Sequence, residues 1–153
     1  MIESIKKSRT ERKAIIEKAK SQERPIFAED TANNKFASNV RNVPPKEGYY
    51  DVALHGTPTY AEFFGEKIDA YTLAKIIKSR DDYVKGTKIR LLSCSTGNID
   101  ETGDCFAQLL ANELGVEVEA PTKTIWVHEE GNVLIGDTPY SNNGEFKTFY
   151  SRK

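Results

Sequence analysis

The sequence predicts an α/β protein with a mostly parallel central sheet flanked by helices, followed by a C-terminal β-hairpin. Three short segments rich in apolar residues have the pattern of strands, at 49–56, 87–95 and 116–121. They alternate with two amphipathic segments of helical period, at 69–86 and 105–115. Because a strand–helix–strand order favours right-handed crossovers, we expect these strands to pair in parallel.

The two helical segments carry their own start and stop signals. In the first, Asp69 is the predicted N-cap and Gly86 the predicted stop. Its apolar face is formed by Leu73, Ile76, Ile77 and Val84. In the second, Gly115 is the predicted stop, and the apolar face is formed by Phe106, Leu109, Leu110 and Leu114.

After the third strand, segment 123–137 has two apolar stretches on either side of Glu130-Gly131-Asn132. This pattern is typical of a β-hairpin. The tail, 145–153, is expected to add one more strand.

The N-terminal residues differ in composition from the rest of the chain. Residues 1–20 contain no Gly or Pro and predict a helix. Residues 1–24 hold eight Lys and Arg against four Glu, so we interpret them as a basic helical linker or arm. Residues 21–48 are rich in turn-forming residues and predict an irregular lead-in. We expect residues 25–153 to form a single α/β domain.

Composition restricts the classes of function. The chain has 153 residues and a net charge of −1, which gives no global support for binding nucleic acid. It contains no apolar run of the roughly 20 residues that a membrane-spanning helix needs, and its N-terminus lacks the apolar region of a secretory signal. Its two cysteines have no spacing typical of a zinc site. The sequence therefore predicts no nucleic-acid partner, no membrane span, no metal and no cofactor.

A histidine and a cysteine end two successive predicted strands. His55 follows "YYDVAL" and Cys94 follows "IRLLS", and small residues come after each of them. Because functional groups of an open α/β sheet gather at the carboxyl ends of its strands, we expect the two side chains to reach one substrate carbonyl. A thiol paired with an imidazole is a nucleophile with its general acid and base.

The small residues around this pair complete the predicted site. Gly56 and the Cys94 N–H are candidate donors to a developing oxyanion. Further small residues are expected to form a rim through which a peptide approaches, namely Ser93, Ser95, Thr96 and Gly97. A buried structural cysteine is the competing interpretation of Cys94, because cysteine is among the most buried residue types.

The remaining cysteine and histidine are given other interpretations. Cys105 begins a predicted helix and is expected to serve packing. His128 lies in the alternating segment "TIWVHEE", where a strand residue is expected, and it is kept as a rival partner for Cys94.

The segments "YDVALHG" and "IRLLSCSTG" resemble the caspase-like cysteine peptidases, a fold that includes caspases and the self-processing domains of large bacterial toxins. The segment "FAQLLANELGVEVEAPT" is similar to one found in toxin domains at the C-termini of bacterial polymorphic secreted proteins. The resemblance covers residues 49–136. It implies a caspase-like fold with His55 as general acid and base, Cys94 as nucleophile, and Gly56 with the Cys94 amide as oxyanion donors.

The sequence also departs from this family. Ser93 precedes Cys94 in "LSCST", which differs from the Gln-Ala-Cys context of true caspases. The toxin processing domains bind inositol hexakisphosphate through a basic cluster, and no matched cluster is found in this sequence, so that ligand is not predicted.

The resulting hypothesis is a cysteine peptidase that acts as the toxic or processing module of a larger bacterial secreted protein. Its expected partners are a protein or peptide substrate and a cognate immunity protein, and its expected place of action is the cytosol of a target cell. Two alternatives stay open. One is a deamidase or transglutaminase-like toxin that pairs Cys94 with His128, and the other is a non-catalytic module that binds a ligand or an immunity protein.

Overall fold

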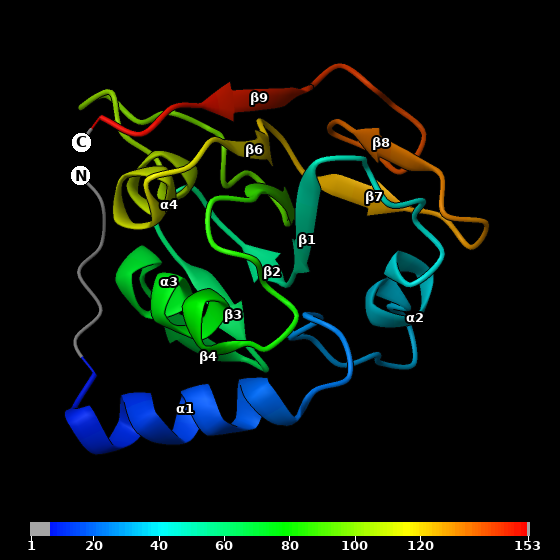
Figure 1. Ribbon diagram of the computed structural model, residues 1–153. Helices are drawn as coiled ribbons and strands as arrows, with labels where there is room; N and C mark the ends of the chain where they lie inside the picture. The colour runs from blue at the N-terminus through cyan, green and yellow to red at the C-terminus, as the bar shows by residue number, and fades with distance from the viewer. Residues whose placement is uncertain (1–6, 153) are drawn as a thin grey trace.

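A computed structural model describes residues 7–152 and places a four-stranded sheet at the centre of the molecule (Figure 1). The strands lie in the order β1-β5-β6-β9. Their bounds are β1 Tyr49–Ala53, β5 Lys88–Leu92, β6 Val118–Pro121 and β9 Phe146–Phe149. The first three are parallel, and β9 is antiparallel to β6. The mostly parallel sheet flanked by helices is therefore confirmed, and the tail supplies one of its edge strands.

Two helices connect the parallel strands. Helix α3 (Ala70–Ser79) joins β1 to β5, and α4 (Phe106–Leu114) joins β5 to β6. Because the strand order advances in one direction, right-handed crossovers place both helices on the same face of the sheet, where they pack on each other (Figure 1). Helix α1 (Arg9–Ser21) packs on α3 at this face, while α2 (Phe36–Val40) lies at the opposite face (Figure 1).

Side-chain alternation along the strands divides the core in two. Val52, Leu54 and Leu91 belong to the large cluster under α1, α3 and α4. Ala53 and Leu92 point the other way, into a smaller cluster with residues of α2, β7 and β8. Cys94, two residues beyond Leu92, also packs against this smaller cluster.

The helix signals are confirmed with one exception. The Asp69 side chain caps α3 by accepting a hydrogen bond from the Thr72 N–H, and Gly115 ends α4 with φ of 70°. The helix that was expected to continue to Gly86 ends at Ser79, because the chain turns away at Arg80 to bury that side chain. Val84 is consequently 73% exposed and does not belong to the apolar face of α3.

Short antiparallel units surround the central sheet. The predicted strand 49–56 is split, since β1 ends at Ala53 and β2 (His55–Gly56) pairs instead with β3 (Ala61–Phe63), which pairs with β4 (Glu66–Ile68). At the other face, β7 (Ile125–Val127) and β8 (Val133–Ile135) pair antiparallel, with residues 128–132 between them. Strand β9 follows this pair and returns to the central sheet.

The described part of the basic N-terminal segment is a packed helix. Ser8 and Glu11 form a capping box at the start of α1, and Ile15 and Ala19 are buried in the large core cluster. Arg80 donates hydrogen bonds to the carbonyls of Ala19 and Gln22, at the end of this helix. The first six residues of the predicted helix lie outside the described part. Within residues 7–152, no helix is long and apolar enough to cross a membrane.

Candidate functional site

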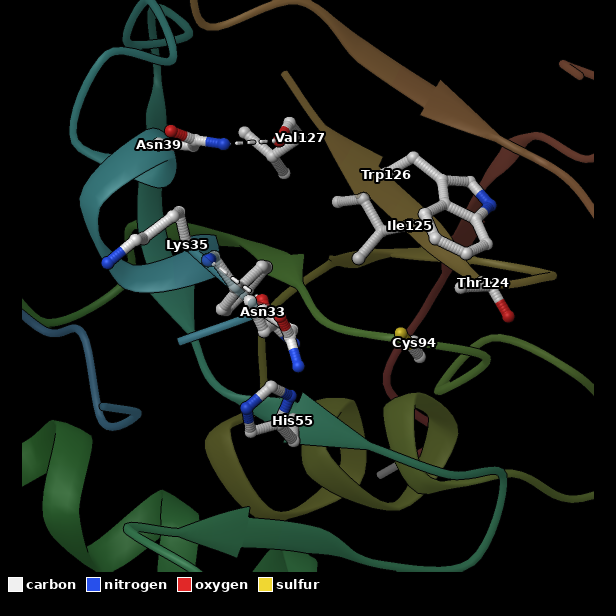
Figure 2. A pocket seen from close by; sticks show the side chains of 11 residues that line it. Asn33, Lys35, Asn39, His55, Cys94, Thr124, Ile125, Trp126 and Val127 are labelled. Carbon is white, nitrogen blue, oxygen red and sulfur yellow. Dashed lines mark hydrogen bonds between the residues drawn. The ribbon is translucent and has the colours of Figure 1, made fainter. Parts of the chain in front are cut away.

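A pocket of about 380 Å³ opens where β1 and β5 end, between α2 with its preceding loop and β7 (Figure 2). His55 and Cys94 both line it. Its other walls come from residues distant in sequence, namely Asn33, Asn34, Lys35, Phe36, Asn39, Thr124, Ile125, Trp126 and Val127. The structure thus brings together the two residues that the sequence singled out.

Strand pairing explains why these two side chains line one pocket. Ala53 of β1 pairs with Leu92 of β5, and His55 and Cys94 each lie two residues further along. Cys94 packs against the same cluster as Ala53 and Leu92, and both His55 and Cys94 line the pocket walled by α2 and β7. Figure 2 shows both side chains at the floor of the pocket, with Trp126 and Ile125 above Cys94.

The backbone beside His55 is packed tightly against the cysteine loop. A Cβ added to Gly56 would lie 3.0 Å from the carbonyl oxygen of Cys94 and 2.6 Å from Cγ2 of Thr96. Glycine is therefore the residue that lets the His55 segment approach the Cys94 segment. On its other side, the imidazole contacts Phe36 of α2, with ring centroids 5.3 Å apart and planes inclined by 34°.

The thiol of Cys94 is half-buried and carries no disulfide. Burial raises the pKa of this thiol, because a thiolate is poorly solvated there, and a hydrogen bond from the Ile125 N–H lowers it by a smaller amount. The free protein therefore holds Cys94 as a neutral thiol at neutral pH. A nucleophile in this setting needs a base at the moment of attack.

The loop after Cys94 is fixed by hydrogen bonds. Ser93 and Thr96 are both fully buried, and their hydroxyls lie 2.8 Å apart. They therefore support the loop from beneath and do not form the predicted rim, because their hydroxyls bond each other in the interior. The N–H groups of Ser95 and Gly97 donate to the carbonyls of Lys123 and Pro121, at 3.0 and 2.8 Å.

Ser95 has an unusual backbone conformation. Its φ of 54° lies in the left-handed region, which costs a non-glycine residue about 1–2 kcal/mol. This conformation reverses the chain directly after Cys94, so that the loop can pair with residues 121–123. Ser95 is half-buried. The other predicted rim residues, Ser93, Thr96 and Gly97, are buried.

Comparison with known proteins assigns the chain to a family. Residues 23–135 match the family described as Domain of unknown function (DUF8616). The chain belongs to this family. No curated protein and no solved structure matches the chain. The DUF8616 match includes every lining residue of the pocket, whereas α1 and β9 lie outside it.

Half of the pocket of this DUF8616 chain was missed by the sequence interpretation. Residues 33–39 belong to the stretch for which the sequence predicts an irregular lead-in, since asparagines are typical of turns. It is held at the pocket by contacts distant in sequence. Asn39 Nδ2 donates to the Val127 carbonyl at 3.0 Å, and Asn42 Nδ2 donates to the Glu129 carbonyl at 2.9 Å.

The other histidine and cysteine of this DUF8616 chain lie elsewhere. His128 lines a different pocket, where it stacks on Tyr140 and its Nε2 lies 2.8 Å from the Pro139 carbonyl. Cys105 is fully buried at the N-cap of α4, where packing was expected. Among residues 7–152, no cluster of three or more His, Cys, Asp or Glu side chains could hold a metal ion.

Proposed function

We propose that this DUF8616 protein is a thiol hydrolase that cleaves peptide bonds with Cys94 as nucleophile and His55 as general acid and base. One observation carries the proposal. His55 and Cys94 each lie two residues beyond a paired position of the adjacent parallel strands β1 and β5, and both line the same pocket. A carbonyl bound in that pocket would meet both groups.

The proposed reaction conserves its atoms in two steps. His55 takes the thiol proton as the sulfur of Cys94 attacks the peptide carbonyl, and the imidazolium then gives that proton to the leaving amine. This leaves a thioester on Cys94. Water then attacks the thioester with His55 as base, which releases the acid and restores the thiol.

Two features of the backbone support a place for the developing oxyanion. Within residues 7–152, the Cys94 N–H donates to no backbone carbonyl, although neighbouring amides of the loop do. Gly56 keeps the His55 backbone close to residues 93–96, since an added Cβ would lie 3.0 Å from the Cys94 carbonyl oxygen and 3.2 Å from Cβ of Ser93. We propose that the Cys94 N–H, with Gly56 beside it, stabilises the tetrahedral intermediate.

The finer classification rests on resemblance. We propose a caspase-like peptidase, because the segments "YDVALHG" and "IRLLSCSTG", each an apolar run followed closely by His or Cys, resemble that group. By the same resemblance we propose that the domain is the effector or processing module of a larger bacterial secreted protein, which acts in a target cell and has a cognate immunity protein.

The test is a cleavage assay on a mixture of unfolded proteins, with new N-termini identified by mass spectrometry. The intact chain is compared with Cys94→Ala and His55→Ala. Cys105→Ala and His128→Ala are matched controls, because each removes the same chemical group from a site outside the pocket. We expect both controls to cut like the wild type, and Cys94→Ala to be inactive. Removal of the general base should slow cleavage by about 10²–10⁴-fold.

The pattern of loss separates the alternatives. Cleavage that depends on Cys94 and His128, but not on His55, would replace the proposed pair with the rival one. A folded wild-type chain that cuts nothing would instead favour a binding module. The raised pKa of the Cys94 thiol is the observation that favours the binding module as a second candidate function.

A further inference from the structure

Six basic side chains line two neighbouring pockets on the face of the molecule formed by α1 and α3. We call this set the basic face, and it consists of Arg9, Arg12, Lys13, Lys75, Lys78 and Lys85. The first pocket, of about 430 Å³, lies between α1 and α3, and the second, of about 380 Å³, lies beside the end of α3. Lys75 and Lys78 are three residues apart on α3, so they lie on one side of the helix and connect the pockets.

The packing of the two helices concentrates positive potential at the first pocket. Arg12 lies 5.1 Å from the ring centroid of Tyr71, near the start of both helices, while Arg80 contacts the carbonyl of Ala19 near the end of both. Helices α1 and α3 therefore run in the same direction. Their N-terminal ends, which carry partial positive charge, lie on the side of Arg12 and Tyr71.

Among residues 7–152, these cations have no acidic partners. In that range no carboxylate lines either pocket, and none forms an ion pair with a member of the basic face. Arg12 donates to the Lys7 carbonyl at 3.3 Å, and its Nε makes no hydrogen bond with the described residues. Arg12 and Lys75 both contact the ring of Tyr71, which is 42% exposed.

The remainder of the molecule is acidic. When the six residues of the basic face are excluded from the count, the chain has 16 Lys and Arg against 23 Asp and Glu. An acidic partner would thus be attracted to one face and repelled by the others, which fixes its orientation. The basic face also lies across the central sheet from α2 and β7, so a partner bound there leaves the pocket of His55 and Cys94 open (Figure 1).

We propose that the basic face is a docking site for an acidic polypeptide, whose Asp and Glu side chains enter the two pockets. The extent of the site favours a polypeptide, because two pockets joined along α3 exceed what one small anion covers. Carboxylates match this lining in charge, and arginine binds them with two parallel hydrogen bonds. Tyr71 offers an exposed ring between cations for apolar contact.

Binding of a fluorescent poly-L-glutamate peptide to the intact chain, measured by anisotropy at increasing salt, tests this proposal. The variant Lys13→Gln, Lys75→Gln, Lys78→Gln is compared with the control Lys20→Gln, Arg41→Gln, Lys147→Gln, which has the same net charge. The control changes exposed cations outside both pockets. We expect the basic-face variant to weaken binding by about tenfold or more and to reduce its salt dependence, with little change in the control.

Two further arms make the outcome decisive. Carbodiimide cross-linking of the bound peptide to the wild-type chain should occur at Lys13, Lys75, Lys78 and Lys85, and cross-links spread over other lysines would overturn the proposal even if the variant failed to fold. Equal weakening in both variants would also overturn it, as an effect of net charge alone. Sodium tripolyphosphate that binds at the basic face where poly-L-glutamate does not would identify a phosphate ligand instead. None of these readouts depends on catalytic activity.

Discussion

The proposed chemistry depends on the thiol of Cys94. The surroundings of this thiol favour its protonated form. Burial raises its pKa, and the Ile125 N–H offsets only part of that increase. Because the thiolate is the form that is alkylated, we expect iodoacetamide to label the Cys105→Ala chain slowly at neutral pH. The rate should rise with pH through a midpoint above about 8.5, the value of a free thiol. Initial rates over a pH series give this midpoint, and one below that value would contradict the structure.

His55→Ala is the matched control for that titration. His55 is not among the groups that shift the pKa of Cys94, so its removal should leave the labelling midpoint unchanged. The same substitution should slow peptide cleavage if His55 acts only when a carbonyl is bound. A midpoint that shifts in His55→Ala would mean that the imidazole already interacts with the thiol in the free protein.

The sequence predicts single site residues where an apolar strand directly precedes them, because the strand then indicates where the residue lies in the sheet. His55 and Cys94 were identified because each follows an apolar run, and the strand register then places them in one pocket. Ser93 and Thr96 were misjudged as rim residues, since their mutual hydrogen bond depends on a loop conformation that the residue types do not specify. The positive φ of Ser95, on which that loop depends, is equally invisible in the sequence.

Arg80 connects helix α1 to the rest of the fold through hydrogen bonds. Its side chain is buried and donates to the carbonyls of Ala19 and Gln22, to the Tyr50 hydroxyl and to the Asp82 carboxylate. Arg80→Gln leaves several of these acceptors without a partner, and we expect it to lower the free energy of unfolding by about 2–4 kcal/mol. This range lies below that of a fully buried ion pair because the Asp82 side chain is 44% exposed.

Urea unfolding measures that loss, and hydrogen exchange shows where it acts. The amides of α1 should lose protection before those of the central sheet. Arg24→Gln is the matched control, because Arg24 makes a single exposed hydrogen bond to the Arg41 carbonyl, and it should cost less than about 0.5 kcal/mol. Equal losses in the two variants would show that Arg80 has no special role in holding the helix.

The wall between α2 and the β7–β8 pair depends on close approach at Gly131. Its φ is 93°, and a Cβ there would overlap the Asn42 carbonyl. Gly86 has almost the same φ, 92°, but has open space around it. We expect Gly86→Ala to cost about 1–2 kcal/mol from backbone conformation alone, and Gly131→Ala to cost about 1–3 kcal/mol more from overpacking. Unfolding in urea measures both, and equal costs would refute this close packing.

Elements were predictable where their signals are local. Asp69 and Gly115 mark the ends of α3 and α4 as the sequence indicates. Helix α2 was missed because it has only five residues and no side-chain cap. It is positioned by Asn39 and Asn42, whose partners lie 88 and 87 residues away. No local pattern encodes such contacts, so the sequence located the floor of the pocket but not its opposite wall.

At the scale of the whole molecule, the parallel sheet separates two surfaces of different chemistry. The large core cluster lies under α1, α3 and α4, whose outer side includes most of the basic face. The smaller cluster lies toward α2 and β7, beside the pocket of His55 and Cys94. This separation follows from the alternation of side chains along β1 and β5. It would allow a partner and a substrate to bind at the same time.

Whether α1 is part of the folded domain or a separate arm is a question about the whole chain. The sequence interpretation sets residues 1–24 apart as an arm, and the DUF8616 match begins at residue 23. In the structure, however, Ile15 and Ala19 are buried against the large core cluster, and Arg80 contacts the end of the helix. We therefore expect a chain that begins at Glu23 to be less stable than the full chain by at least about 2 kcal/mol, the contribution of burying Ile15 alone.

Urea unfolding of both chains, followed by the fluorescence of the single tryptophan and by circular dichroism, tests this expectation. Trp126 lies in β7, across the sheet from α1, so its signal reports on a region that the truncation does not touch (Figure 1). A lower urea midpoint at Trp126 in the truncated chain would show that α1 and the domain unfold as one cooperative unit. An unchanged midpoint would show that α1 is an independent arm, and the domain would then begin where the family match does.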